Sequence, residues 1–170
     1  HLYIQFFRLN MFAKNTYIIK GGIKVFSSSD KTVEKIINFY SQDPFPGYEL
    51  TDDRLNILKK GDENPFTFNL KKHIGNNKKI LEVGSGTCQL STYLSIGSTN
   101  SITAFDANYN SLKTGYDFSE RNEIQNIQYV CGDIFDDIFL ENQFDVIICN
   151  GVLHHTKNTF EAIKHVVKLL

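Results

Sequence analysis

Residues 79–90 constrain the fold more than any other stretch of the chain. An apolar, β-branched run stops abruptly at Gly84 and Gly86, and a sequence suited to a helix begins directly after them. Gly84 permits a tight turn, and the absence of a Cβ at Gly86 lets a ligand lie against the backbone. The free N–H groups at the start of the next helix then face the crevice beside the turn. This strand–turn–helix pattern is typical of the first unit of a nucleotide-binding α/β sheet.

Strand and helix patterns alternate from residue 79 onward, which predicts a parallel sheet with helices on its faces. The predicted strands span residues 79–83, 101–105, 127–131 and 144–149, and the predicted helices span residues 88–96, 109–121 and 158–169. The last strand is almost continuously apolar, as a strand covered on both faces requires. We therefore predict an α/β fold built on a Rossmann-like parallel sheet.

The first 75 residues have a different pattern. Residues 16–26 predict a β-hairpin, because the pair Gly21-Gly22 supplies the positive φ of a tight turn. Three helices are then predicted: residues 30–40, residues 52–60 ended by Gly61, and residues 65–74 with Phe68 and Leu70 facing inward. We divide the chain into an N-terminal hairpin and helical lead-in, residues 1–75, and a core, residues 76–170, within one structural domain.

The residues around the glycine turn favour a positively charged ligand over a pyrophosphate. A dinucleotide-binding fingerprint requires a third small residue where this chain has Gln89. Glu82, two residues before the first glycine, would place a carboxylate beside two negative phosphates. A carboxylate at that position suits a ligand that carries an ammonium or sulfonium group.

The stretch that begins at Glu82 resembles the first motif of the class I S-adenosylmethionine (SAM)-dependent methyltransferases, written E-x-G-x-G-x-G. Glu82, Gly84 and Gly86 match this motif, and Cys88 stands at its last glycine. The resemblance covers residues 79–170 and implies SAM as the cofactor and S-adenosylhomocysteine as the product. It also implies three further strands beyond the last predicted helix, so we expect an incomplete core with an exposed sheet edge at residues 144–149. We predict that a second copy covers this edge in a homodimer.

Polar residues at the carboxyl ends of the predicted strands are candidates for binding the cofactor. Asp106 follows Gly86 by 20 residues, and a carboxylate there accepts hydrogen bonds from a ribose diol, which SAM and NAD share. The resemblance assigns Asp133 to the adenine amino group and Ile134 to the adenine ring. The alternatives are a helix cap for Asp106 and a solvated loop position for Asp133. The predicted cofactor-binding residues are Glu82, Gly84, Ser85, Gly86, Thr87, Asp106, Ala107, Gly132, Asp133, Ile134, Asn150, Gly151, Tyr40 and Tyr48.

The segment N-G-V-L-H-H-T at residues 150–156 resembles the V-L-H-H stretch of small-molecule methyltransferases, which passes the methionine and sulfonium portion of the cofactor. From Asn150 onward it departs from the N/D-P-P-Y pattern of methyltransferases that modify nucleic acids and protein amino groups. His154 and His155 are candidate general bases, with a structural or solvent-facing histidine as the alternative. Adjacent residues of a regular element cannot both face one ligand. No spacing of histidine and cysteine supports a metal site.

Aromatic residues gather before the first strand of the core, at residues 40–48. In the family that the chain resembles, similar segments fold over the cofactor or shape the acceptor pocket. Tyr40 and Tyr48 are the leading candidates, since a phenol can donate to a cofactor carboxylate or contact a sulfonium. The alternative is a turn packed on the core.

Composition restricts partners and location. A net charge of −1 provides no basic field to hold nucleic acid. Cys88, Cys131 and Cys149 lie in or beside apolar runs, which predicts buried reduced thiols and a cytoplasmic location. No apolar run has the length that crosses a membrane, so no membrane partner is predicted.

We predict a SAM-dependent methyltransferase that transfers a methyl group to an O, N or C nucleophile of a small-molecule acceptor. Two alternatives stay open. The first is a non-catalytic SAM-binding or interaction module. The second is an NAD(P)-dependent oxidoreductase, which Glu82 and Gln89 disfavour.

Overall fold

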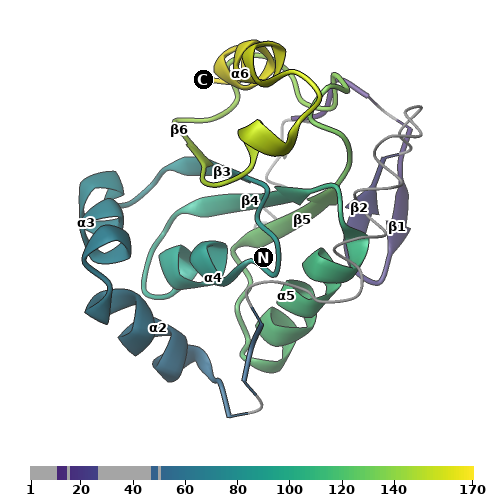
Figure 1. The fold of residues 1–170 in the computed structure, drawn as a ribbon. Helices are drawn as coiled ribbons and strands as arrows, with labels where there is room; N and C mark the ends of the chain where they lie inside the picture. Colours follow the sequence, from purple (N-terminus) through teal and green to yellow (C-terminus); the bar gives the residue numbers. More distant parts are fainter. Residues whose placement is uncertain (1–10, 15, 27–46, 50) are drawn as a thin grey trace, which may run out of the picture.

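A computed structural model describes residues 11–14, 16–26, 47–49 and 51–170. Its centre is a six-stranded sheet of order β1-β2-β5-β4-β3-β6 (Figure 1). The strands are β1 (Ile18–Lys20), β2 (Ile23–Val25), β3 (Lys79–Val83), β4 (Ser101–Asp106), β5 (Ile127–Cys131) and β6 (Val146–Cys149). The pairing of β1 with β2 is antiparallel, and the other four pairings are parallel. The predicted α/β fold with a parallel sheet is confirmed.

Helices cover both faces of the sheet. They are α2 (Arg54–Glu63), α3 (Pro65–Ile74), α4 (Gln89–Ser95), α5 (Tyr109–Arg121) and α6 (Thr159–Val167), with a short 3-10 helix, η1 (Leu153–His155). In Figure 1, α6 lies above the sheet and α2, α4 and α5 lie below it. The strands and helices predicted after residue 79 are all present, with ends shifted by one or two residues.

Alternation along β3 sends its side chains into two separate cores. Leu81 and Val83 are buried on the α6 side with Val166. Ile80 is buried on the opposite side, in a cluster that includes Ile57 of α2. Because β3 is buried on both faces, the glycine turn that follows it starts from a fixed point in the molecule.

The predicted hairpin is confirmed, and β2 joins it to β5 at one end of the sheet. Gly22 has φ +82°, and a Cβ there would lie 2.1 Å from Cζ of Tyr116. The second glycine of the turn is therefore required both by its backbone conformation and by a ring of α5 packed against it.

Two details of the lead-in differ from the prediction. Helix α2 does not end at Gly61 but continues to Glu63. A Cβ on Gly61 would lie 2.0 Å from Cδ2 of Tyr93, so this glycine makes room for a ring of α4 instead of ending a helix. In α3, Phe68 is 47% exposed and does not face inward. The helix predicted at residues 30–40 lies outside the described residues.

Strand β6 is the last strand at its end of the described sheet, where it pairs with β3. It is two residues shorter than predicted and begins at Val146. The exposed edge expected from the sequence is therefore present in the described part of the chain. Homodimer formation across it stays a prediction.

Candidate cofactor site

The turn between β3 and α4 is tied by its backbone to the end of β4. The N–H groups of Gly84 and Ser85 both donate to the carbonyl of Phe105, at 2.7 and 3.1 Å. Gly84 and Gly86 have φ values of 70° and 53°, which favour glycine. A Cβ on Gly84 would lie 2.0 Å from Val152, so the segment after β6 packs directly on the turn.

Cys88, at the last glycine of the motif, is accommodated by a glycine of α5. It keeps a left-handed conformation with φ 65°, and its side chain is fully buried. The thiol faces Gly115, where an added Cβ would lie 2.8 Å from the Cys88 sulfur. Burial raises the pKa of the Cys88 thiol well above its ordinary value, so the thiol stays neutral and unreactive.

Asp106 connects the end of β4 to the glycine turn. Its Oδ2 accepts from the N–H of Gly86 at 2.8 Å, and its Oδ1 accepts from the N–H of Asn108 at 2.8 Å. Burial raises the pKa of Asp106, while the N–H donors of Asn108, Gly86 and Ala107 oppose this rise. Three N–H donors leave the carboxylate, which has about four acceptor positions, with room for a further donor.

Glu82 lies beneath the turn and faces α4. It is 7% exposed, and it accepts from both the hydroxyl and the backbone N–H of Ser91. Burial raises the pKa of Glu82 to about 7, against the lowering effect of Ser91 and with a further rise from nearby Asp106. A buried carboxyl whose ionisation is opposed by a second carboxylate nearby favours a cationic ligand.

The loop after β5 meets the same edge of the sheet. The N–H of Gly132 donates to the carbonyl of Asp106 at 3.1 Å. Asp133 is buried, and its Oδ1 accepts from the N–H of Phe135 at 3.0 Å. Ile134 is half-buried and packs against the core on the α6 side. Three strand ends therefore bring Glu82, Asp106 and Asp133 to one edge.

The remaining candidates lie in the segment after β6, in the helix layer or outside the described residues. Asn150 and Gly151 are exposed after β6, and His154 is exposed in η1. The hydroxyl of Tyr48 shares a hydrogen bond of 3.2 Å with Oγ1 of Thr92. Its ring stacks on Phe118 of α5, so the structure places Tyr48 in the helix layer. Tyr40 and the side chain of His155 lie outside the described residues.

Sequence reasoning missed Ser91, which holds Glu82, and the donor role of Gln89. The Nε2 of Gln89 donates to the carbonyl of Gly47 at 2.7 Å. The sequence placed Ser91 in the first turns of a predicted helix but did not indicate which strand residue it faces. Long-range contacts of this kind depend on how α4 packs on β3.

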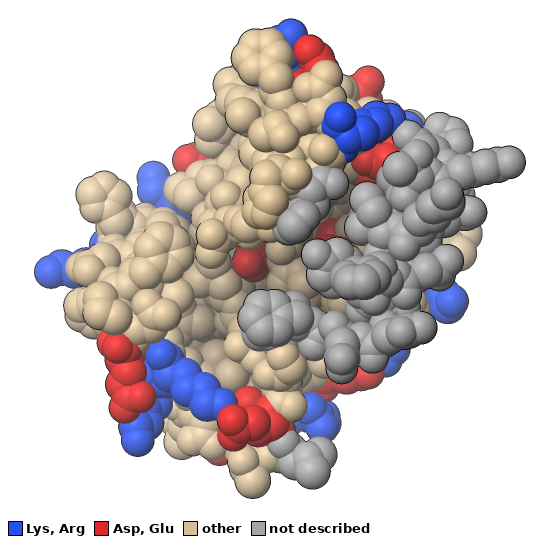
Figure 2. Space-filling view, in the orientation of Figure 1, with Lys and Arg blue, Asp and Glu red and all other residues tan. Residues whose placement is uncertain are grey.

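The molecular surface is hollowed on the face shown in Figure 2, between α6 and the side that carries α2 and α3, and acidic atoms are visible in this hollow. Within the described ranges, no three histidine, cysteine or acidic residues form a group that could hold a metal ion. No described helix is long and apolar enough to cross a membrane.

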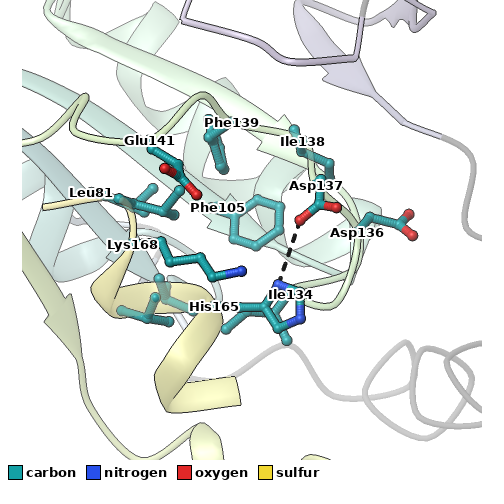
Figure 3. Close-up of a pocket in the computed structure, with 13 residues that line it drawn as sticks. Leu81, Phe105, Ile134, Asp136, Asp137, Ile138, Phe139, Glu141, His165 and Lys168 are labelled. Carbon is teal, nitrogen blue, oxygen red and sulfur yellow. Dashed lines mark ion pairs between the residues drawn. The ribbon is translucent and has the colours of Figure 1, made fainter. Parts of the chain in front are cut away.

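A cavity of about 40 Å³ lies beneath α6, and Val83 and Phe105 beside the turn are among its lining residues (Figure 3). Leu81, Phe105 and Phe139 form its apolar part. His165 closes its rim by pairing with Asp137, with 3.7 Å between Nδ1 and Oδ1. A volume of this size holds a water molecule but no nucleoside.

Comparison with known proteins matches residues 81–170 to a family described as methyltransferase domain. The chain is 30% identical over 112 residues to ubiquinone biosynthesis O-methyltransferase from two strains of Rickettsia bellii, OSU 85-389 and RML369-C. This match covers 62% of the chain and 45% of each relative. The chain thus spans less than half the length of these curated relatives.

Solved structures share the fold. A SAM-dependent methyltransferase from Aquifex aeolicus matches with a TM-score of 0.52 and 16% identity, covering 70% of this chain and 68% of that one. The (4+2)-cyclase SpnF matches with a TM-score of 0.60 and 18% identity, covering 89% of this chain and 60% of that one. At these identities the likeness concerns the fold alone.

Proposed function

Because the chain belongs to the family of SAM-dependent methyltransferase domains, we propose that it binds SAM at the glycine turn and transfers the methyl group to a small molecule. The observation that carries this proposal is the contact between the N–H of Gly86 and Oδ2 of Asp106. It sets a carboxylate acceptor for a ribose diol directly beside the turn.

The charges of the site suit SAM better than NAD. Glu82 is buried and Asp106 is partly buried, and each is held by N–H donors that keep the carboxylate in place. A sulfonium or ammonium group nearby lowers the cost of ionising both groups. The pyrophosphate of NAD would add negative charge to the same place, which argues against an NAD(P)-dependent oxidoreductase.

Different residues of the site would bind different parts of SAM. Asp106 would accept from the ribose hydroxyls, Asp133 and Ile134 would hold the adenine, and Glu82 would balance the positive charge. The proposal also includes the other cofactor-binding residues predicted from the sequence, which are Gly84, Ser85, Gly86, Thr87, Ala107, Gly132, Asn150, Gly151, Tyr40 and Tyr48. Bound SAM supplies a methyl group that is already activated by the sulfonium.

The chain would then contribute mainly by orientation. Aligning the nucleophile with the methyl carbon and the sulfur can lower the barrier by about 7 kcal/mol or more. His154, exposed in η1 after β6, is the proposed general base for an acceptor that must lose a proton, and His155 is the second candidate.

The acceptor is proposed from the relatives. The Rickettsia bellii proteins are O-methyltransferases of ubiquinone biosynthesis, which favours a hydroxyl among the O, N and C nucleophiles of a small molecule. One structural neighbour is a (4+2)-cyclase, so a non-catalytic SAM-binding or interaction module stays the alternative to methyl transfer. A cytoplasmic location and the division at residue 75 are part of the same proposal.

Thermal unfolding with added ligands tests the cofactor. SAM or S-adenosylhomocysteine at about 100 times its dissociation constant adds about 2.7 kcal/mol of stability, which raises the melting temperature by roughly 5 °C. NAD and NADP should leave it unchanged. Asp106→Ala should abolish the shift, whereas Asp117→Ala, on the exposed side of α5, should retain it. A shift with NAD alone would contradict the proposal.

An activity assay distinguishes a methyltransferase from a non-catalytic SAM-binding module. Incubation with SAM and a panel of hydroxylated small molecules should release S-adenosylhomocysteine for at least one acceptor. Cofactor binding without turnover on any acceptor, in a version that spans the full length of the relatives, would favour the non-catalytic alternative.

A further inference from the structure

The helix that follows the glycine turn lacks a cap of its own. Cys88, its N-cap residue, is left-handed and makes no capping hydrogen bond with its side chain. Helix α4 has seven residues, so its first turn is a large part of it. The orientation of this turn must therefore be fixed by contacts from other parts of the chain.

The sheet provides one of these contacts. Glu82 accepts from the hydroxyl and N–H of Ser91, which holds the inner side of the first turn of α4 against β3. This contact leaves the outer side of the helix unsecured.

The outer side is held by residues 47–49 and 51–53, which we call the strap. Gly47 of the strap accepts from Nε2 of Gln89 at 2.7 Å, at the start of α4. Tyr48 bonds to Thr92 one turn later and stacks on Phe118, with ring centroids 4.2 Å apart and planes at 12°. The strap thus lies across α4 and α5, and Gln89 is its contact nearest the glycine turn.

The strap is itself anchored. Asp52 accepts from the N–H of Glu49 at 2.8 Å and pairs with Lys60 of α2 at 2.7 Å. One residue beyond the strap, the N–H of Arg54 donates to Oδ1 of Asn122 at 3.1 Å, at the end of α5. A donor on α4 that binds this strap is therefore bound to a fixed support.

We propose that Gln89 is a positioning residue of the cofactor site, which holds the first turn of α4 and the glycine turn before it in the orientation that receives the adenosyl group. This inference rests on the proposed function. It also gives a role to the residue that departs from the dinucleotide fingerprint, since a glycine or alanine there has no donor for the carbonyl of Gly47.

The test compares Gln89→Ala with Gln125→Ala, an exposed glutamine outside the site. Binding of S-adenosylhomocysteine and of 5′-methylthioadenosine, which lacks the amino-acid portion, is measured by calorimetry. Loss of one positioning hydrogen bond should weaken both ligands by the same factor, about three- to tenfold. The melting temperature without ligand should stay within about 2 °C of the parent, since surface substitutions have small effects. Gln125→Ala should change nothing.

Two results would overturn the inference. Unchanged binding of both ligands by Gln89→Ala would show that the contact does not position the site. A loss confined to S-adenosylhomocysteine would show that Gln89 contacts the amino-acid portion directly.

A second measurement does not depend on the ligand. The amides of Gly84, Ser85, Gly86 and Cys88 are all hydrogen-bonded, so hydrogen exchange reports how firmly the turn is held. Gln89→Ala should accelerate their exchange several-fold, and Tyr48→Phe should do so less because its ring stack remains. If the parent chain bound no adenosyl ligand, the proposed function would fail, and unchanged exchange would separately refute the role of Gln89.

Discussion

At the scale of single residues, Glu82 makes the stability of the protein depend on pH. Burial raises the pKa of Glu82 from 4.5 to about 7. Below pH 4.5 the carboxyl is neutral in both folded and unfolded chains. Between the two values the unfolded chain releases its proton while the folded chain keeps it, so the free energy of unfolding falls as pH rises, by about 3 kcal/mol in total. Above pH 7 both forms are ionised and the loss is constant.

Glu82→Gln should remove this dependence, because an amide stays neutral and still accepts from Ser91. The free energy of unfolding of Glu82→Gln minus that of the parent should rise by about 3 kcal/mol between pH 4.5 and pH 8. Urea unfolding at several pH values measures it. Glu63→Gln, at a side chain 65% exposed, is the control and should show no such rise. Parallel profiles for Glu82→Gln and the parent would contradict the assignment.

At the scale of helices and strands, local pattern predicted what local chemistry decides. The run before Gly84, the helix start at Pro65 and the hairpin glycines each act within a few residues, and the corresponding elements form as predicted. The end of α2 could not be predicted in this way. A glycine in a helical pattern is normally a stop signal, but Gly61 is required by Tyr93, which lies 32 residues away in the sequence.

The same limit applies to the site. Asp106 was predictable because its position at a strand end follows from the sheet, and Gly86 proves to be its partner. The partners of Cys88 and Gln89 were not predictable, because Gly115 and Gly47 reach them only through the packing of α5 and the strap. Motif spacing therefore located the turn but not the contacts that support it.

Gly61→Ala tests this account of α2. Alanine in a helix interior normally stabilises a protein by about 1 kcal/mol relative to glycine. Here the new Cβ would lie 2.0 Å from a ring that is 2% exposed and whose hydroxyl donates to Asp62 at 2.8 Å. We expect a loss of about 1–3 kcal/mol in the free energy of unfolding instead. In a Tyr93→Leu background, where the ring is absent, Gly61→Ala should cost less than it does in the parent chain. A Gly61→Ala variant more stable than the parent would refute the packing role.

At the scale of the whole molecule, the surface near β6 is the place where a second copy would bind. Along α6, Phe160, Ile163 and Val167 are exposed by 65%, 42% and 57%, at a spacing that puts them on one helical stripe. Leu170, beyond the end of α6, is also apolar and is 52% exposed. Apolar side chains in a contiguous row beside a sheet edge favour association.

Sedimentation can test whether the exposed apolar stripe of α6 mediates the predicted homodimer. Sedimentation velocity over a range of concentrations should show a monomer–dimer equilibrium for the parent chain. Ile163→Lys, in the middle of the stripe, should weaken the association at least tenfold, because it places a charge in the apolar contact. Glu120→Lys, at an exposed position of α5 on the opposite face of the sheet from α6 in Figure 1, serves as the control and should leave the association unchanged. A parent chain that sediments as a monomer at all concentrations would rule out the dimer, and the apolar stripe would then require another occupant.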